Sequence, residues 1–270
     1  EEIIHVLPQD FKVDGQSEIK EPIGMYGSRL EANFHIVVGQ VSSIRNIGKC
    51  IKSSGLEMGD ITLEPLASSD AVLSFEEKDA GVALIDIGGG TTEVAVLSLG
   101  DIVYARSVRV GGDRMDEAII SYLRRQQNLL VGESTAERIK TSIGTARMPD
   151  DGRGASMMIR GRDLLTGVPR ETEISQAHVA EALGEPVQQI CEAVMTALEV
   201  TPPDLAADIV DRGVMLTGGG ALLGDLDLAL RERTGLAVSI ADESLNCVAM
   251  GTGKALEYEK QLRHAIDYDS

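Results

Sequence analysis

Hydrophobic residues recur along this chain with two periods, one typical of strands and one typical of helices. Apolar runs of about four to eight residues predict strands, and they occur at residues 3–7, 31–39, 61–66, 82–87, 93–99, 102–110, 157–168, 214–216 and 237–241. Apolar residues three or four apart predict helices, at residues 43–53, 68–73, 115–123, 134–143, 175–198, 221–234 and 245–262, with another short helix starting at 203. Interleaved strands and helices predict an α/β fold.

The most regular part of the pattern is a continuous apolar run at residues 82–87, which ends in three glycines. Such a run is typical of a strand that is buried on both faces. The predicted strands 93–99 and 102–110 follow after short connections, so the three strands are expected to form an antiparallel meander. A second glycine triplet, 218–220, follows the apolar strand 214–216. Because open α/β sheets bind ligands at the carboxyl ends of their strands, both triplets are candidate ligand sites.

The first glycine loop carries residue types that can hold a phosphate group. With its flanks it reads Asp86, Ile87, Gly88, Gly89, Gly90, Thr91, Thr92 and Glu93. Glycines let the backbone approach an anion and present successive N–H donors, and the threonines add hydroxyl donors. Asp86 at the strand end is suited to hold Mg²⁺ through water, and Glu93 to orient or deprotonate an attacking water. Taken alone, however, a glycine triplet is more often a plain turn between strands.

The second glycine loop adds a place for the rest of a nucleotide. Residues 218–221 lead into a predicted helix, whose start offers free N–H groups, so the loop can lie against an adenosine. Ser134 and Glu137 form the pattern of a capping box, and Glu137 shares a helix face with Lys140. This pair can contact ribose and adenine, or it can be an exposed ion pair. Asp113 is either a second acidic residue near the metal or the N-cap of the next helix.

Composition narrows the expected partners. A net charge of -18 repels nucleic-acid backbones, and 3% aromatic content offers few stacking platforms, so no nucleic acid partner is expected. No apolar run approaches the ~20 residues of a membrane span and no basic signal region opens the chain, so the cytoplasm is expected.

Three distant cysteines support neither a disulfide framework nor a zinc site. The acidic run 76–79 predicts a solvated linker, and Pro186 a kink or break in the long helix.

Several stretches together resemble one family. They are DIGGGTTEVAV (86–96), VGGDRMDEAI (110–119), GESTAERIK (132–140), GVPRE (167–171), PPDLAADIVDRGVMLTGGGALL (202–223) and CVAMGTGKALE (247–257). From about residue 82 to 260 the chain resembles MreB, the bacterial actin-like cell-shape family. The resemblance implies an actin-like or ribonuclease-H-like ATPase fold that binds ATP and Mg²⁺ between two lobes and polymerises into filaments. By position it implies phosphate contacts from residues 88–92, a catalytic role for Glu93, and adenosine contacts from Glu137, Lys140, Gly218, Gly219, Gly220, Ala221 and Leu222.

Residues 5–39 and 55–92 resemble a second family, the actin-like division protein FtsA, entering partway through its inserted subdomain. The two resemblances together imply a partial first lobe at residues 1–79. They imply a complete second lobe at 80–270, with a small inserted subdomain at about 129–177. Both families begin with a phosphate loop of DxGxx type that is not found here, so the phosphates are expected to be held from one side. FtsA's terminal membrane helix is not found either, so membrane contact is expected only through partners.

The leading hypothesis is an ATP-binding cytoskeletal protein of the bacterial cell-shape or division machinery. It is expected to self-associate into filaments, to meet cell-elongation or division proteins, and to hydrolyse ATP slowly if at all. It is expected in the cytoplasm, with partners placing it at the inner face of the membrane. The alternative is a non-catalytic interaction module that docks such partners without productive ATP turnover. Sugar kinases and heat-shock ATPases also bind nucleotide with glycine-rich loops of this kind, but no sugar-binding insertion or peptide-binding domain is identifiable in this sequence.

Overall fold

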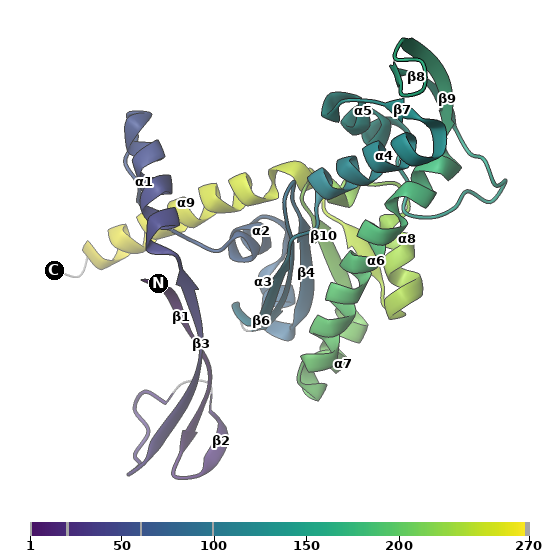
Figure 1. The fold of residues 1–270 in the computed structure, drawn as a ribbon. Coiled ribbons are helices and arrows are strands. Elements are labelled where there is room, and N and C mark those ends of the chain that lie inside the picture. The colour runs from purple at the N-terminus through teal and green to yellow at the C-terminus, as the bar shows by residue number, and fades with distance from the viewer. Residues whose placement is uncertain (1, 20–21, 60, 99, 268–270) are drawn as a thin grey trace.

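The computed structural model describes residues 2–19, 22–59, 61–98 and 100–267, and it has an α/β fold built on three sheets (Figure 1). The strands are β1 (Glu2–Val13), β2 (Gln16–Ile19), β3 (Leu30–Gly39), β4 (Val82–Ile87), β5 (Thr92–Ser98), β6 (Asp101–Val108), β7 (Leu129–Leu130), β8 (Ser156–Asp163), β9 (Pro169–Ser175), β10 (Val214–Thr217) and β11 (Val238–Ile240). The helices are α1 (Val41–Ser53), α2 (Glu64–Val72), α3 (Phe75–Ala80), α4 (Gly112–Gln127), α5 (Glu133–Ile143), α6 (Gln176–Val200), α7 (Pro203–Arg212), α8 (Leu226–Thr234) and α9 (Cys247–Asp267), with the 3₁₀ turns η1 (Gly219–Leu222) and η2 (Ser244–Asn246). The predicted α/β class is confirmed.

The central sheet has the strand order β11-β10-β4-β5-β6. β4, β5 and β6 run antiparallel to one another, which confirms the predicted meander. β10 runs parallel to both β4 and β11. In the register of β10 and β4, Thr217 lies opposite Asp86, so the two glycine loops leave the same edge of the sheet at the same level.

Strand β4 is the centre of the core because it is covered on both faces, and all six of its residues are buried. On one face, Ile85 and Ile87 belong to the large apolar cluster that includes residues of α4 and α6. On the other face, Leu84 packs in a smaller cluster with Leu73, beside α2. A strand buried in this way has no solvent-facing side, which is why its residues are apolar except for Asp86 near its end.

Helix α2 packs closely along α9, the last helix of the described chain. Gly251 of α9 faces the backbone of Ala67 in α2 with no room for a side chain. The Lys254 ammonium, one turn further along α9, donates hydrogen bonds to the carbonyl oxygens of Asp70 and Ala71, each at 3.0 Å. These carbonyls lie at the carboxyl end of α2, where the helix itself supplies no donors.

The first sheet, in the order β2-β1-β3, projects from the rest of the chain (Figure 1). Its strands are antiparallel, and Phe11 packs edge to face against Phe34 with 6.4 Å between ring centroids. Val6, Ile36 and Val38 are about half exposed. This sheet lies within the expected first-lobe region 1–79.

The third sheet, in the order β7-β8-β9, lies within the region where an inserted subdomain is expected, and α5 packs against β8. Helix α2 precedes residue 79 but packs on β4 and α9 of the following region. The division at residues 79 and 80 therefore stays a prediction.

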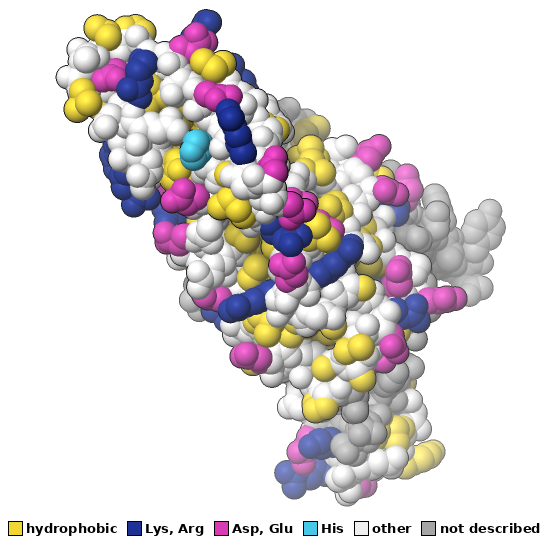
Figure 2. All heavy atoms as spheres, turned by 90° about the vertical axis from the view of Figure 1, so that its right-hand side faces the viewer, with side chains coloured by type: hydrophobic (Ala, Val, Ile, Leu, Met, Phe, Trp, Pro, Cys, Tyr) yellow, Lys and Arg dark blue, Asp and Glu magenta, His cyan; other side chains and the backbone are white. Residues whose placement is uncertain are grey.

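Figure 2 views the molecule from the right-hand side of Figure 1. Over the described part of that face, acidic and basic side chains are interspersed rather than gathered by sign.

Two element predictions before β4 were wrong. Residues 61–66 do not form a strand, because α2 begins at Glu64 and Pro65 occupies its first turn, a position where proline is favoured. The acidic run 76–79 is not a linker but part of α3. Its start is capped by Ser74 and Glu77, which bond each other's backbone N–H groups.

Three further predictions concern helix ends. The capping box at Ser134 was wrong, because α5 begins one residue earlier and its N-cap is Gly132. The helix predicted at 221–234 is divided into η1 and α8, with Asp225 in the left-handed region at φ 57° between them. Pro186 does not break α6, which runs from 176 to 200. Pro186 is itself buried, and burial of the apolar face of α6 offsets the roughly 3 kcal/mol that an internal proline costs.

Candidate functional site

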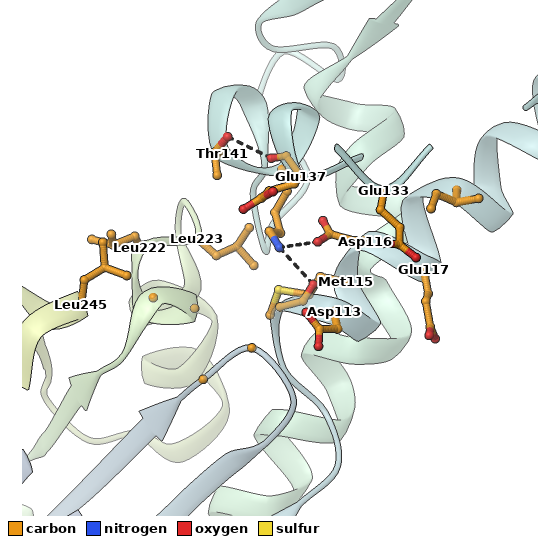
Figure 3. A pocket seen from close by; sticks show the side chains of 17 residues that line it. Asp113, Met115, Asp116, Glu117, Glu133, Glu137, Thr141, Leu222, Leu223 and Leu245 are labelled. Carbon is orange, nitrogen blue, oxygen red and sulfur yellow. Dashed lines mark hydrogen bonds and ion pairs between the residues drawn. The ribbon is translucent and has the colours of Figure 1, made fainter. Parts of the chain in front are cut away.

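A cavity of about 870 Å³ lies where the two glycine loops meet helices α4 and α5 (Figure 3). Of the residues predicted from the sequence, Gly88, Gly89, Asp113, Glu137, Lys140, Gly219, Gly220 and Leu222 line it. The two glycine loops, far apart in the sequence, thus share one cavity. The other predicted residues, Asp86, Gly90, Thr91, Thr92, Glu93, Gly218 and Ala221, are not among those that line it.

The first glycine loop is fixed by the start of α4. The carbonyl oxygen of Gly88 accepts from the N–H of Gly112 at 3.0 Å, and that of Gly89 accepts from the N–H of Asp113 at 2.8 Å. A Cβ on Gly111 would lie 2.5 Å and 2.6 Å from these two oxygens, so the approach requires glycine there. Because the C=O and N–H of a trans peptide point in opposite directions, the N–H groups of Gly89 and Gly90 point away from α4.

Thr92 has a different environment from the one predicted. Its side chain is buried, and its hydroxyl donates to the carbonyl oxygen of Val110 at 2.7 Å. In this arrangement the hydroxyl ties β5 to the segment before α4 instead of facing the cavity. Asp113 is not the N-cap of α4, since Gly111 occupies that position, and Asp113 lies in the first turn.

The second glycine loop packs directly on the first strand end. Gly218 has a φ of 81°, and a Cβ there would lie 2.6 Å from Oδ1 of Asp86 and 2.5 Å from the carbonyl oxygen of Ile87. A Cβ on Gly220 would lie 2.2 Å from Cγ2 of Ile87. Both positions therefore need glycine for the loops to approach one another.

Lys140 is held by two partners on α4. Its Nζ donates to the carbonyl oxygen of Gly112 at 3.0 Å and forms an ion pair with Oδ2 of Asp116 at 2.9 Å. Figure 3 shows these two interactions beside the cavity. The alternative of an exposed ion pair between Lys140 and Glu137 is wrong. Lys140 pairs with Asp116 instead, and the side chains of Lys140 and Asp116 are at most 17% exposed. Burial raises the pKa of Asp116, against the lowering effect of Lys140.

Three carboxyl groups gather beside the strand end. Oδ2 of Asp86 accepts from the hydroxyls of Ser68 at 2.7 Å and Thr217 at 2.8 Å. Glu93 lies opposite Asp86 on β5, and its pKa is raised by burial and then by Glu64 and Asp86. The pKa of Glu64 is raised by burial and then by Asp86. Among the described residues, no group of three or more His, Cys, Asp or Glu is arranged to hold a metal ion directly.

The cavity has a charged side and an apolar side. Asp113, Asp116, Glu117, Glu133 and Glu137 lie on α4 and α5, with Lys140 among them, whereas the glycine loops carry no charge. Leu222 and Leu245 line the cavity with exposed fractions of 59% and 68%. Sequence analysis missed Glu64, Asp116 and Leu245. The Glu-Pro pair at residue 64 is a signal for a helix start that could have placed Glu64 correctly. The sequence pattern contains no signal that places Asp116 or Leu245 at the site.

Among the described residues, no helix combines the length and apolar content that crossing a bilayer requires.

Comparisons with known proteins support both resemblances but shift the boundary between them, because the FtsA-like match ends at residue 38 and the MreB match already begins at residue 32. Residues 32–264 match the family described as MreB/Mbl protein, and residues 1–38 match the SHS2 domain inserted in FtsA. The cell shape-determining protein MreB of Escherichia coli K12 is 49% identical over 213 residues, covering 79% of this chain and 61% of that protein. The cell shape-determining protein Mbl of Bacillus subtilis 168 is 47% identical over 183 residues, covering 68% of this chain and 54% of that protein. The chain thus spans about 61% of the length of the first of these relatives.

Two solved structures show the same fold. MreB 5 of Spiroplasma citri bound to AMPPNP superposes with a TM-score of 0.76 and 35% identity, covering 86% of this chain and 68% of that chain. The MamK double helical filament superposes with a TM-score of 0.66 and 17% identity, covering 81% of this chain and 66% of that chain. At this lower identity the second likeness concerns the fold alone. The predicted actin-like fold is confirmed.

Proposed function

The chain belongs to the MreB/Mbl family, and on that premise we propose that it binds ATP between its two glycine loops and assembles into actin-like filaments. The observation that carries the proposal is the single cavity that both loops line. A glycine loop at a strand end presents backbone N–H groups to an anion, and the cavity volume of about 870 Å³ falls within the usual range for small-molecule sites. The relative from Spiroplasma citri was solved with AMPPNP bound, which supports the assignment.

The charge distribution gives the nucleotide an orientation. The acidic residues of α4 and α5 repel phosphates, whereas the uncharged first glycine loop, at residues 88–90, offers amides. The phosphates therefore lie at the first glycine loop, and the nucleoside lies toward α4, α5, the second glycine loop and the leucines. Leu222 and Leu245 supply apolar surface for a base, and the Glu137 carboxylate can accept from ribose hydroxyls.

Mg²⁺ is proposed as the companion of the phosphates. The residues fit a metal held through water, because Asp86 stands beside both glycine loops but already accepts two hydroxyl bonds on Oδ2. A bound Mg²⁺ would neutralise phosphate charge there. Ser68 and Thr217 orient the carboxylate through their hydrogen bonds to Oδ2.

We assign slow ATP hydrolysis to the carboxyl groups beside the strand end. Glu93, close to Glu64 and Asp86, has a raised pKa, which makes its carboxylate a better proton acceptor at neutral pH. Glu93 is proposed to position the attacking water. Turnover is expected to be slow, as for a protein whose cycle is coupled to assembly.

We propose that nucleotide binding leads to self-association of the chain into filaments. The relative from Escherichia coli is named a cell shape-determining protein, and cell-elongation or division proteins are the proposed partners. The proposed location is the inner face of the membrane, reached through such partners. Mixed-sign charge on the face in Figure 2 suits protein contacts better than contact with nucleic acid.

A titration with fluorescent ATP tests the nucleotide site. Gly89→Asp places a carboxylate at the loop, where repulsion of the phosphates costs on the order of 1–4 kcal/mol, a roughly 5- to 1000-fold loss of affinity. Gly184→Asp is the matched control, because Gly184 is exposed on α6 and nothing lies within 4 Å of its Cβ position. Equal binding by wild type, Gly89→Asp and Gly184→Asp would remove the loop from the site.

A non-catalytic interaction module is the second candidate, favoured by the match of residues 1–38 to the FtsA inserted domain and by the half-exposed apolar side chains on that sheet. Single-turnover phosphate release, compared with sedimentation, separates the two. Filaments that form with ATP but release no phosphate support the module, whereas phosphate release that accompanies sedimentation supports the ATPase.

A further inference from the structure

Asp116 has one carboxylate oxygen that the protein leaves without a partner. Oδ2 is paired with Lys140 at 2.9 Å, but Oδ1 is buried and accepts no hydrogen bond from the described residues. Asp116 lines the cavity, and Figure 3 shows its carboxylate beside the Lys140 ammonium on the α4 side. A buried acceptor without a donor is destabilising unless something else satisfies it.

None of the neighbouring side chains donates a hydrogen bond to Oδ1 in this arrangement. Lys140 is tied to the carbonyl oxygen of Gly112 as well as to Oδ2, which fixes the position of its ammonium. Asp113 and Glu137 act on Asp116 as like charges, and ionised carboxylates only accept hydrogen bonds. The donor therefore comes from outside the described residues.

A nucleoside has the donors that this oxygen lacks. Phosphate oxygens of ATP do not donate when ionised, whereas the ribose hydroxyls and the exocyclic amine of adenine do. In the orientation proposed above, the nucleoside lies toward α4 and α5, on the side of the cavity where Asp116 stands. The raised pKa of Asp116, caused by burial, agrees with a carboxylate whose surroundings are completed by a ligand.

We propose that Asp116 is a specificity-determining residue of the nucleotide site, whose Oδ1 accepts a hydrogen bond from an O–H or N–H of the nucleoside. Lys140 holds the carboxylate in place through Oδ2. This inference rests on the proposed function, since it requires a nucleotide in the cavity.

The test compares nucleotides that each lack one donor. Isothermal titration calorimetry of the wild type with ATP, 2′-deoxy-ATP, 3′-deoxy-ATP and purine riboside triphosphate, which has hydrogen in place of the adenine amine, should show weaker binding of one analogue by about 10- to 100-fold, as expected for a lost hydrogen bond to a charged group. Asp116→Asn keeps the shape, but its single oxygen stays with Lys140, so its NH₂ group faces the nucleoside donor. This variant should lose affinity for ATP but not for that analogue, so that the discrimination disappears.

Asp227→Asn is the matched control, because Asp227 is an ion-paired carboxylate on α8 outside the cavity, 3.4 Å from Arg231. Its nucleotide preferences should equal those of the wild type. Circular dichroism checks folding, and Asp116→Ser replaces Asp116→Asn if the latter does not fold.

Two results would overturn the inference while leaving the proposed function intact. One is a wild type that binds ATP and all three analogues equally. The other is an Asp116 variant that weakens all four nucleotides by the same factor, which would make Asp116 only a link between α4 and α5. A wild type that binds no nucleotide would instead remove the proposed function and this inference together.

Discussion

A Cβ on Gly251 would lie 1.6 Å from the carbonyl oxygen of Ala67, so helices α9 and α2 touch backbone to backbone at this point. The contact joins the end of the described chain to a helix that covers β4. No side chain fits unless one of the two helices moves.

Gly251→Ala should therefore destabilise the protein, by about 1–3 kcal/mol or more, as for overpacking in a core. Urea unfolding followed by circular dichroism measures the change. Gly253→Ala is the control, since nothing lies within 4 Å of its Cβ position. The control should gain up to about 1 kcal/mol from the better helix propensity of alanine. A Gly251→Ala variant that is as stable as Gly253→Ala would mean that α9 does not pack on α2 in solution.

Lys254→Met should lower stability by about 1 kcal/mol, because the ammonium satisfies the carbonyl oxygens of Asp70 and Ala71 at the end of α2. Methionine keeps the length and apolar character of the stem but removes the donor. Lys49→Met, at an exposed position on α1, should leave the unfolding midpoint unchanged. A midpoint unaffected by Lys254→Met would argue against this cap.

Glu93→Gln should raise stability at neutral pH while it lowers phosphate release by roughly 100-fold or more. The raised pKa of Glu93 means that folding favours the protonated form, so stability is lost as pH rises from the ordinary glutamate pKa through the raised one. The stabilising effect should therefore be present at about pH 7.5 and absent well below about pH 4.3. Urea midpoints at both pH values measure it.

Glu199→Gln, at an exposed position near the end of α6, is the matched control for both readouts. A stabilisation by Glu93→Gln that persists unchanged in acid would show that burial of the charge is not its cause. Unchanged phosphate release would take Glu93 out of the proposed mechanism.

The three cysteines should differ in reactivity. Cys50 is exposed, whereas Cys191 and Cys247 are buried, and burial raises the pKa of both buried thiols. Titration of the native protein with a thiol reagent should label Cys50 rapidly, and urea should be needed before the other two react at a comparable rate. Rapid labelling of Cys247 in the native protein would show that the start of α9 detaches from the core.

The sequence predicted the parts of the fold that depend on local pattern. The run 82–87 and the glycine loop after it carry their own signal, since a doubly buried strand has no solvent-facing side. Glu64 was misassigned because its neighbours Ile61 and Leu63 resemble a strand, while Pro65 marks a helix start. Tertiary packing decided between the two signals.

The residues of the candidate site, too, were predicted only where a local sequence pattern indicates them. The glycines of both loops were predicted from their positions at strand ends, and several of them line the cavity. Asp116 was not predicted, because its importance lies in a bond to Lys140 and an unpartnered oxygen, neither of which a sequence displays. Thr92 was expected to face a phosphate, and only the packing of β5 against Val110 shows where its hydroxyl goes.

The pairing of Thr217 with Asp86 limits how this protein can vary. Each residue of a strand advances the chain by about 3.3 Å and reverses the side to which the next side chain points. Deleting one residue from β4 or β10 would set one loop a step behind the other. In β4 the deletion would turn Asp86 away from Ser68, and in β10 it would turn Thr217 away from Asp86. Substitutions in these strands can be tolerated where volume is kept, whereas changes in their length cannot.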